Sequence, residues 1–243
     1  MELNLALQLY SIRNETAKDF FGSLEKVAAL GFKGVEFAGY GGIKAEEMRA
    51  KLDSLGLFTT SVHHGLPEMH EHFDELVAYN KVLGNTNLVC AWAPFDNWEQ
   101  VQAQTAELGE MADKLAACGM KLYYHNHSHE FVKFEQDGGR YAYDVMMEKL
   151  GSRVGVQFDI YWLYRAGVDA IEYLDKYKDR IGLIHVKDGD EKHGLPAGTG
   201  KVEIKKIVSH AQSLGVKWFV LEDETEADQF TAVKTGIDNI FAL

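Results

Sequence analysis

The chain has 243 residues, 46% of them hydrophobic, and a formal net charge of −12 at pH 7. This acidic balance argues against nucleic acid as a partner, because binding to phosphates requires clustered Lys and Arg side chains. The sequence has no run of about 20 apolar residues, which argues against a membrane-spanning helix and a membrane partner.

Domain organisation and compartment are predicted from the same survey. No segment rich in Pro, Ser or charge separates two halves, so we expect one domain over residues 1–243. The two cysteines, Cys90 and Cys118, fit a reducing compartment. The first residues, Met1-Glu2-Leu3-Asn4, lack the basic and apolar segments of a signal peptide, and we therefore expect a cytoplasmic protein.

Short apolar runs alternate with amphipathic stretches along the chain. The runs, each predicted to be a strand, are 5–9, 32–37, 57–62, 87–91, 120–124, 153–158, 182–186 and 216–221. The stretches with helical spacing are 20–30, 45–54, 68–83, 97–117, 141–149, 168–178, 202–213 and 229–240. Many junctions carry a Gly typical of the residue that ends a helix. Eight strand–helix pairs predict an α/β fold with a parallel sheet, and favour a single closed (β/α)8 TIM barrel.

Each of the last three predicted strands ends on a side chain of a type that can bind a metal ion. Asp159 follows 154–158, His185 follows 181–184, and Glu222 follows 218–221. Barrel enzymes keep their chemistry at the C-terminal ends of the strands, and adjacent strands lie only about 4.8 Å apart. These three side chains can therefore share one divalent ion. The alternatives are that Asp159 only caps a helix and that His185 is a satisfied core residue.

The fifth predicted strand, 120–124, opens into a polar segment that offers a fourth ligand. Its candidates are His125, His127 and Glu130. Carboxylate and imidazole ligands together suit zinc, manganese, cobalt and similar ions. We therefore expect one divalent metal ion as cofactor (Mn, Co, Zn or Mg).

Other strand ends supply candidate substrate contacts. Lys187 lies two residues beyond His185 and so on the same side of its strand, where it can stabilise an enolate; the alternative is a surface lysine paired with Asp188. Of His63 and His64 one should face the barrel mouth, and we favour His64. Further candidates are Glu36, as a partner of sugar hydroxyls, and the aromatic residues Tyr10, Trp92 and Trp162.

The segment Gly198-Thr199-Gly200-Lys201 follows the seventh predicted strand. Backbone N–H groups before a helix can hold a phosphate. We favour the alternative, a flexible loop that leads into the next helix. Without an arginine cluster in the sequence, a non-phosphorylated sugar, cyclitol or glycoside is favoured slightly over a sugar phosphate.

Several segments resemble the xylose-isomerase-like sugar isomerase/epimerase barrels. They are YYHNHSHEF (123–131), QFDIYW (157–162), IHVKD (184–188), VLE (220–222), LQLYSIR (7–13) and GVEFAGY (34–40). The resemblance implies a (β/α)8 barrel with one divalent ion held by Glu, Asp, His and Glu. Asp159, His185 and Glu222 match the last three positions. Many relatives have Glu where this chain has His125, but the subfamily with an NHxxEF segment places it later, at Glu130. We favour Glu130, with His125 or His127 as the alternative.

The resemblance also implies an activity, that of a metal-dependent sugar or sugar-phosphate isomerase/epimerase. Such an enzyme transfers a proton next to a carbonyl through a metal-stabilised enediolate. Glu130 and Glu222 would be its acid/base pair, Lys187 would assist, and His125 and His127 would contact a small carbohydrate. Alternatives are a sugar or cyclitol dehydratase, a glycoside lyase and a non-catalytic sugar-binding barrel. A related nuclease is disfavoured, because it needs more metal ligands and a basic face. The helical outer face leaves a homodimer possible.

Overall fold

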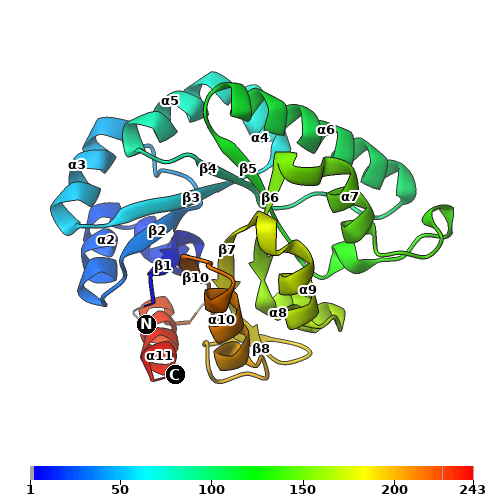
Figure 1. Cartoon of the computed structure of the whole chain (residues 1–243). Helices are drawn as coiled ribbons and strands as arrows, with labels where there is room; N and C mark the ends of the chain where they lie inside the picture. Colours follow the sequence, from blue (N-terminus) through cyan, green and yellow to red (C-terminus); the bar gives the residue numbers. More distant parts are fainter. Residues whose placement is uncertain (1–2, 226, 243) are drawn as a thin grey trace.

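The computed structural model describes residues 3–225 and 227–242. Within these residues, eight parallel strands close into a barrel in the order β1-β10-β7-β6-β5-β4-β3-β2 (Figure 1). The barrel strands are β1 (Leu5–Gln8), β2 (Gly34–Phe37), β3 (Phe58–His64), β4 (Asn87–Cys90), β5 (Lys121–His125), β6 (Val154–Asp159), β7 (Ile181–Val186) and β10 (Trp218–Leu221). The short strands β8 (Asp188–Gly189) and β9 (Gly194–Leu195) pair antiparallel in the loop after β7. The predicted (β/α)8 barrel is confirmed.

Helices surround the barrel and cover its outer face (Figure 1). They are α1 (Arg13–Thr16), α2 (Phe20–Ala29), α3 (Ala45–Leu55), α4 (Leu66–Glu71), α5 (Phe73–Leu83), α6 (Trp98–Ala117), α7 (Ala142–Leu150), α8 (Ile160–Ala166), α9 (Ala170–Tyr177), α10 (Ile204–Ser213) and α11 (Gln229–Phe241). Short 3-10 turns are η1 (Leu9–Ile12), η2 (His129–Phe131), η3 (Glu135–Asp137), η4 (Gly151–Arg153) and η5 (Lys178–Arg180). Their apolar faces pack on the outward side chains of the strands and form the main core.

The helices differ from the predicted ones at three places, one of which is the short helix α1, which was not predicted. The stretch 68–83 holds two helices, α4 and α5, which meet at His72, where the backbone leaves the helical region (φ −117°, ψ 28°). The helix α8 was not predicted, because it begins directly after a strand. Its N-terminus is capped by Asp159, whose side chain accepts hydrogen bonds from two backbone N–H groups. This cap makes the end of β6 a sharp strand-to-helix junction.

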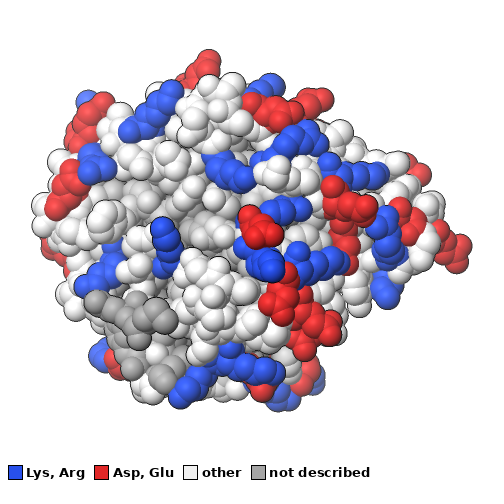
Figure 2. All heavy atoms as spheres, viewed as in Figure 1, with Lys and Arg blue, Asp and Glu red and all other residues white. Residues whose placement is uncertain are grey.

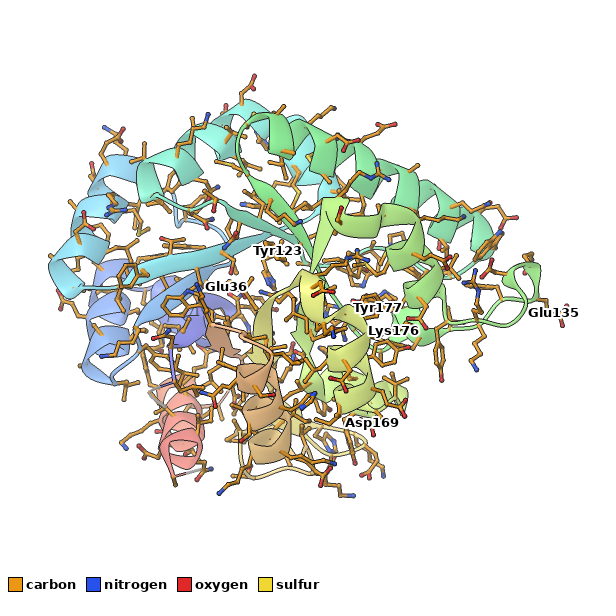
Figure 3. The ribbon with its side chains drawn as sticks, in the orientation of Figure 1. Glu36, Tyr123, Glu135, Asp169, Lys176 and Tyr177 are labelled. Carbon is orange, nitrogen blue, oxygen red and sulfur yellow. The ribbon has the colours of Figure 1, made fainter. Side chains whose placement is uncertain are left out.

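The barrel interior has an apolar floor and a polar upper part. Ala6, Leu183 and Val220 form a small buried cluster against Tyr123 and Trp218. The next inward side chains toward the C-terminal ends of the strands are polar, since side chains alternate along a strand. Among them is Glu36, which lies within the ring of strands together with Tyr123 (Figure 3). The fold thus places polar side chains at the C-terminal end of the barrel interior, next to a buried apolar layer.

No helix in the part of the chain described here is long and apolar enough to cross a membrane. Charged side chains of both signs are interspersed over the face of the molecule seen in Figure 2. That face therefore lacks the uniform positive charge that a phosphate backbone would require.

The floor generates a prediction about stability. A Cβ atom added at Gly155 would collide with the Tyr123 ring, so Gly155→Ala should lower the free energy of unfolding by about 1–3 kcal/mol. Urea denaturation measures this difference. Gly194→Ala is the matched control, because its Cβ would meet nothing closer than 3.9 Å. Equal stability of the two variants would contradict the packing described for the floor.

Candidate metal centre

Four buried side chains from four adjacent strands meet at the C-terminal mouth of the barrel. They are His125 at the end of β5, Asp159 at the end of β6, His185 on β7 and Glu222 directly after β10. Each offers one ligand-type atom, and these four atoms all lie within 4.8 Å of one another. The structure therefore brings together the three side chains that end the last strands, and adds His125 to them.

Asp159 has one oxygen engaged and one without a partner. Its Oδ1 accepts hydrogen bonds from the backbone N–H groups of Tyr161 (2.9 Å) and Trp162 (3.0 Å). Its buried Oδ2 has no hydrogen-bond partner among the described residues. Burial raises the pKa of Asp159 to about 7, against the effect of the nearby Lys187 ammonium. Helix capping and metal binding are thus compatible in one carboxylate, and Oδ2 is where a cation fits.

His185 lies between two carboxylates. Its Nε2 is 2.5 Å from Glu36 Oε1, and its Nδ1 is 2.6 Å from Glu222 Oε2. Burial by itself would lower the pKa of His185, but the two carboxylates outweigh it and raise this pKa to about 10. A histidine ligand of a metal ion commonly donates its second N–H to a carboxylate, which fixes the ring. Glu36 takes the place of that partner for Nε2, while Nδ1 faces Glu222 and would have to exchange this contact for an ion.

His125 is oriented by a glutamine. Its Nδ1 lies 3.0 Å from Gln157 Oε1, while Gln157 Nε2 donates to Glu36 Oε2 (2.5 Å). The glutamine amide is therefore oriented with its oxygen toward the ring, so His125 Nδ1 donates and Nε2 is the free acceptor. Burial lowers the pKa of His125 well below the usual value. A neutral imidazole with a free Nε2 is the form that binds metal ions.

Glu130 lies outside this group of four. Its carboxylate accepts hydrogen bonds from Tyr124 Oη (2.9 Å) and from the backbone N–H of His127 (2.8 Å). Tyr123 and His125 point into the barrel, so Tyr124 points toward the helices, and the turn η2 carries Glu130 to the same side. The ligand-type atoms near Glu130 belong instead to His127 and His129. Of the three candidates for the fourth ligand, the geometry favours His125 over Glu130, which had been preferred from the sequence.

Lys187 is buried, not a surface lysine paired with Asp188. It is 1% exposed, and its Nζ lies 3.4 Å from Glu222 Oε1 and 2.8 Å from Glu224 Oε1. Burial would lower its pKa, but the surrounding carboxylates raise it, so the ammonium is retained. In turn, Lys187 and His185 outweigh burial and hold the pKa of Glu222 well below its usual range. The pair is an ionised base beside a fixed positive charge.

A cavity of about 520 Å³ opens at the barrel mouth, and two of the four side chains, His125 and Glu222, line it. Of the predicted substrate contacts, four line this cavity: Tyr10, His64, His125 and His127. Two others lie beside it. The Trp92 ring is 55% exposed and lies near His129, and the Trp162 ring is 4.9 Å from Lys187 Nζ.

Glu36 is not available to sugar hydroxyls, which corrects the prediction made for it. Both of its oxygens are engaged below the cavity by four side chains besides His185: Gln8, Ser61, His63 and Gln157. Burial would raise its pKa, but His63 and His185 lower it well below the usual value. A fully hydrogen-bonded, ionised carboxylate in the barrel interior acts on the site through His185.

Both histidines of β3 line the cavity, and they differ in what they contact. His63 points inward, and its Nε2 lies 2.7 Å from Gln157 Oε1 and 3.0 Å from Glu36 Oε1. His64 lines the outer part of the cavity, where its Nδ1 is 2.9 Å from Glu68 Oε2. The sequence offered His63 only as the alternative to His64 and missed Gln157, although a polar residue within an apolar strand was a signal for it.

The segment 198–201 has no free N–H groups of the kind that hold a phosphate. The buried carboxylate of Asp188 accepts hydrogen bonds from four backbone N–H groups, those of Gly189, Gly198, Gly200 and Val202, at 2.8–3.0 Å. An acidic side chain of the protein thus occupies the place an anion would take. The preferred alternative of a loop leading into a helix holds, but Asp188 anchors this loop.

Comparisons with known proteins agree with this architecture. The family model of the xylose isomerase-like TIM barrel matches residues 24–242. Inosose dehydratase of Lacticaseibacillus casei is 27% identical over 151 residues, which cover 54% of this chain and 48% of that protein. The chain thus spans about half the length of this dehydratase. Hydroxypyruvate isomerase of Escherichia coli K12 is 28% identical over 209 residues, which cover 76% of this chain and 79% of that protein.

Solved structures show the same fold. A sugar phosphate isomerase/epimerase from Parabacteroides distasonis aligns with a TM-score of 0.87 and 24% identity, over 100% of this chain and 99% of that one. The IolI protein with a bound zinc atom aligns with a TM-score of 0.80 and 14% identity, over 99% of this chain and 97% of that one. At these identities the likeness concerns the fold.

The anchoring of the loop generates a prediction. Asp188→Asn replaces an acceptor of four N–H groups by a neutral amide, and should lower the free energy of unfolding by about 2–4 kcal/mol. Urea denaturation measures the loss, and limited proteolysis within 190–200 should become faster. Asp190→Asn is the control in the same loop, since Asp190 is partly exposed and accepts only local bonds. A loss no larger than that of the control would show that Asp188 does not anchor the loop.

Proposed function

We infer that this chain, which belongs to the xylose isomerase-like TIM barrel family, is a divalent-metal-dependent enzyme of the sugar isomerase/epimerase type. Its reaction is proton transfer at a carbon next to a carbonyl of a small carbohydrate. The observation that carries this proposal is the unpartnered Asp159 Oδ2 inside a buried group of four ligand-type side chains that opens to a cavity.

The residues present fit a divalent cation. We propose His125, Asp159, His185 and Glu222 as its ligands, with His125 in the position where many relatives carry a glutamate. Two imidazoles and two carboxylates suit zinc, manganese or cobalt better than magnesium, which prefers oxygen ligands. The zinc atom in the IolI structure supports a metal in this fold. When bound, the cation would supply a Lewis acid that withdraws charge from the substrate carbonyl.

The proton is carried by the chain's own residues in this proposal. Glu222 is ionised beside Lys187 and lines the cavity, so it accepts the proton from the carbon next to the carbonyl. Lys187 contributes a fixed positive charge close to the negative charge that develops on the substrate. Glu130 is turned away, so we assign the return of the proton to His127, which lines the cavity and whose Nδ1 has no partner in the described structure.

Elimination of water is the second candidate. His127 in place of a second carboxylate is the observation that favours it, because an imidazole is suited to protonate a departing hydroxyl. Burial lowers the pKa of His127 to about 3, so the ring is neutral at pH 7, and the proton that it passes to the departing hydroxyl would be the one that Glu222 removes from the substrate carbon. The likeness to inosose dehydratase supports this alternative.

Metal binding should release protons. His185, with a pKa of about 10, and Asp159, with a pKa of about 7, hold about one to two protons at pH 7, and both must lose them to bind a cation. Apparent affinity should therefore rise with pH between 6 and 8. Calorimetric titration with Zn²⁺ or Mn²⁺ in two buffers of different ionisation enthalpy counts the protons released.

Two variants test the ligand set in the same titration. His125→Ala should lower metal affinity by at least about ten-fold, whereas Glu130→Gln, the matched control, should change it by no more than a few-fold. A larger loss of metal affinity in Glu130→Gln than in His125→Ala would show that Glu130 is a ligand and His125 is not. Proton-independent binding, or a stoichiometry of zero, would contradict the proposed metal centre.

The reaction is tested by hydrogen exchange. The metal-loaded protein in D₂O should introduce deuterium at the carbon next to the carbonyl of candidate ketoses, inososes or hydroxypyruvate, as mass spectrometry detects. Glu222→Gln should slow the exchange by about 100-fold or more, because it removes the base. Loss of water from the substrate would instead identify a dehydratase. If no substrate of the panel shows exchange or loss of water, the non-catalytic barrel would be favoured instead.

A further inference from the structure

We propose that the cavity takes a neutral, unphosphorylated polyhydroxy carbonyl compound and discriminates against phosphorylated counterparts through the rim residues Glu68 and Glu224. This inference rests on the proposed function, since it assumes that a carbohydrate binds above the metal centre. Four observations carry it: the charge balance of the interior, the acidic rim, the absence of a free cation at the cavity, and the occupied N–H groups of the loop 188–202.

The charges of the proposed metal centre, of Lys187 and of Glu36 behind it balance one another once a divalent cation is present. Glu36, Asp159 and Glu222 contribute three carboxylates, and Lys187 contributes one ammonium. A divalent cation supplies the two remaining positive charges, with His125 and His185 bound as neutral ligands. The interior therefore has no surplus positive charge to offer an anionic group.

The rim of the cavity adds negative charge. Glu68 and Glu224 both line it, and their side chains are 51% and 41% exposed. Glu68 pairs with His64, and Glu224 pairs with Lys187, whose charge is already counted in the interior. A substrate phosphate at the mouth would therefore face two carboxylates, and like charges at an interface oppose binding.

A basic partner for a phosphate is missing at the cavity. No lysine or arginine is among the described residues that line it. Lys187 is held by two glutamates, and the Arg13 side chain donates to the carbonyl oxygen of Tyr10. Phosphates in proteins are held by such side chains or by free backbone N–H groups.

The loop 188–202 does not supply the missing donors either. In phosphate-binding proteins, the backbone N–H groups of a glycine-rich segment before a helix can hold the phosphate. Here the N–H groups of Gly198, Gly200 and Val202 point at the carboxylate of Asp188. This fixed internal anion competes with any external one at the same place.

Paired ligands test the inference on the metal-loaded protein. The probes are xylitol with xylitol 5-phosphate, sorbitol with sorbitol 6-phosphate, the ketoses fructose and fructose 6-phosphate, and inorganic phosphate alone. Calorimetry or ligand-induced thermal shifts give dissociation constants. Each phosphorylated member should bind at least about ten-fold more weakly than its neutral partner, and the difference should shrink with ionic strength, because exposed charges are screened.

Rim variants show whether Glu68 and Glu224 cause the discrimination. In the double variant Glu68→Gln, Glu224→Gln, the ratio of the two dissociation constants should fall by about three- to ten-fold. Glu135→Gln is the matched control, because Glu135 is exposed at the tip of a loop away from the barrel mouth (Figure 3). Its ratio should equal that of the unmodified protein.

The outcomes separate this inference from the proposed function. Equal or tighter binding of the phosphorylated members would overturn the inference and leave the proposed function intact. An unchanged ratio in the double variant would overturn the role of the two glutamates. Failure of every probe to bind the metal-loaded protein would overturn both, since the cavity would then not be a carbohydrate site.

Discussion

The candidate site depends on one buried arrangement, the His185 ring held between Glu36 and Glu222. Burying two carboxylates costs far more than burying apolar groups unless each is paired and hydrogen-bonded. Glu36 meets this condition with four side chains from three other strands, β1, β3 and β6, and so it links the walls of the barrel through its centre. The ring of His185 is consequently fixed in orientation, with Nδ1 facing the mouth. Every chemical role considered for Glu222 and Lys187 follows from that orientation.

Asp159 shows how one side chain combines architecture and chemistry. Its Oδ1 starts α8, so the chain turns sharply where β6 ends, and its Oδ2 remains free at the mouth. A helix cap and a metal ligand were alternatives when only the sequence was considered. A carboxylate has two oxygens that point in different directions, so the folded chain uses it for the first role and leaves it open to the second.

The position at the end of β5 distinguishes this site from one with two opposed carboxylates. His125 ends β5 within the group of four ligand-type side chains, whereas Glu130 hydrogen-bonds to Tyr124 on the helix side of the strand. An imidazole lowers the negative charge of the ligand set. The acidic groups that remain are concentrated at the rim, in Glu68 and Glu224, where they meet a substrate before the metal centre does. The site therefore has a neutral imidazole at the end of β5 and its exposed carboxylates at the rim of the cavity.

The sequence by itself determined the barrel and three of the four side chains at its mouth. Eight apolar runs alternate with amphipathic stretches, and residues that directly end parallel strands must meet at one rim, which located Asp159, His185 and Glu222. Tertiary structure alone brought His125 rather than Glu130 to the other three side chains, showed that His63 and His64 both line the cavity, and moved Glu36 from the substrate to the interior. The physical reason is that side-chain direction alternates at every residue of a strand, so an uncertainty of one residue in register reverses which side chain faces inward. Beyond the strand ends, in the loops holding Glu130 and Asp188, long-range hydrogen bonds set the geometry, and no local periodicity encodes them.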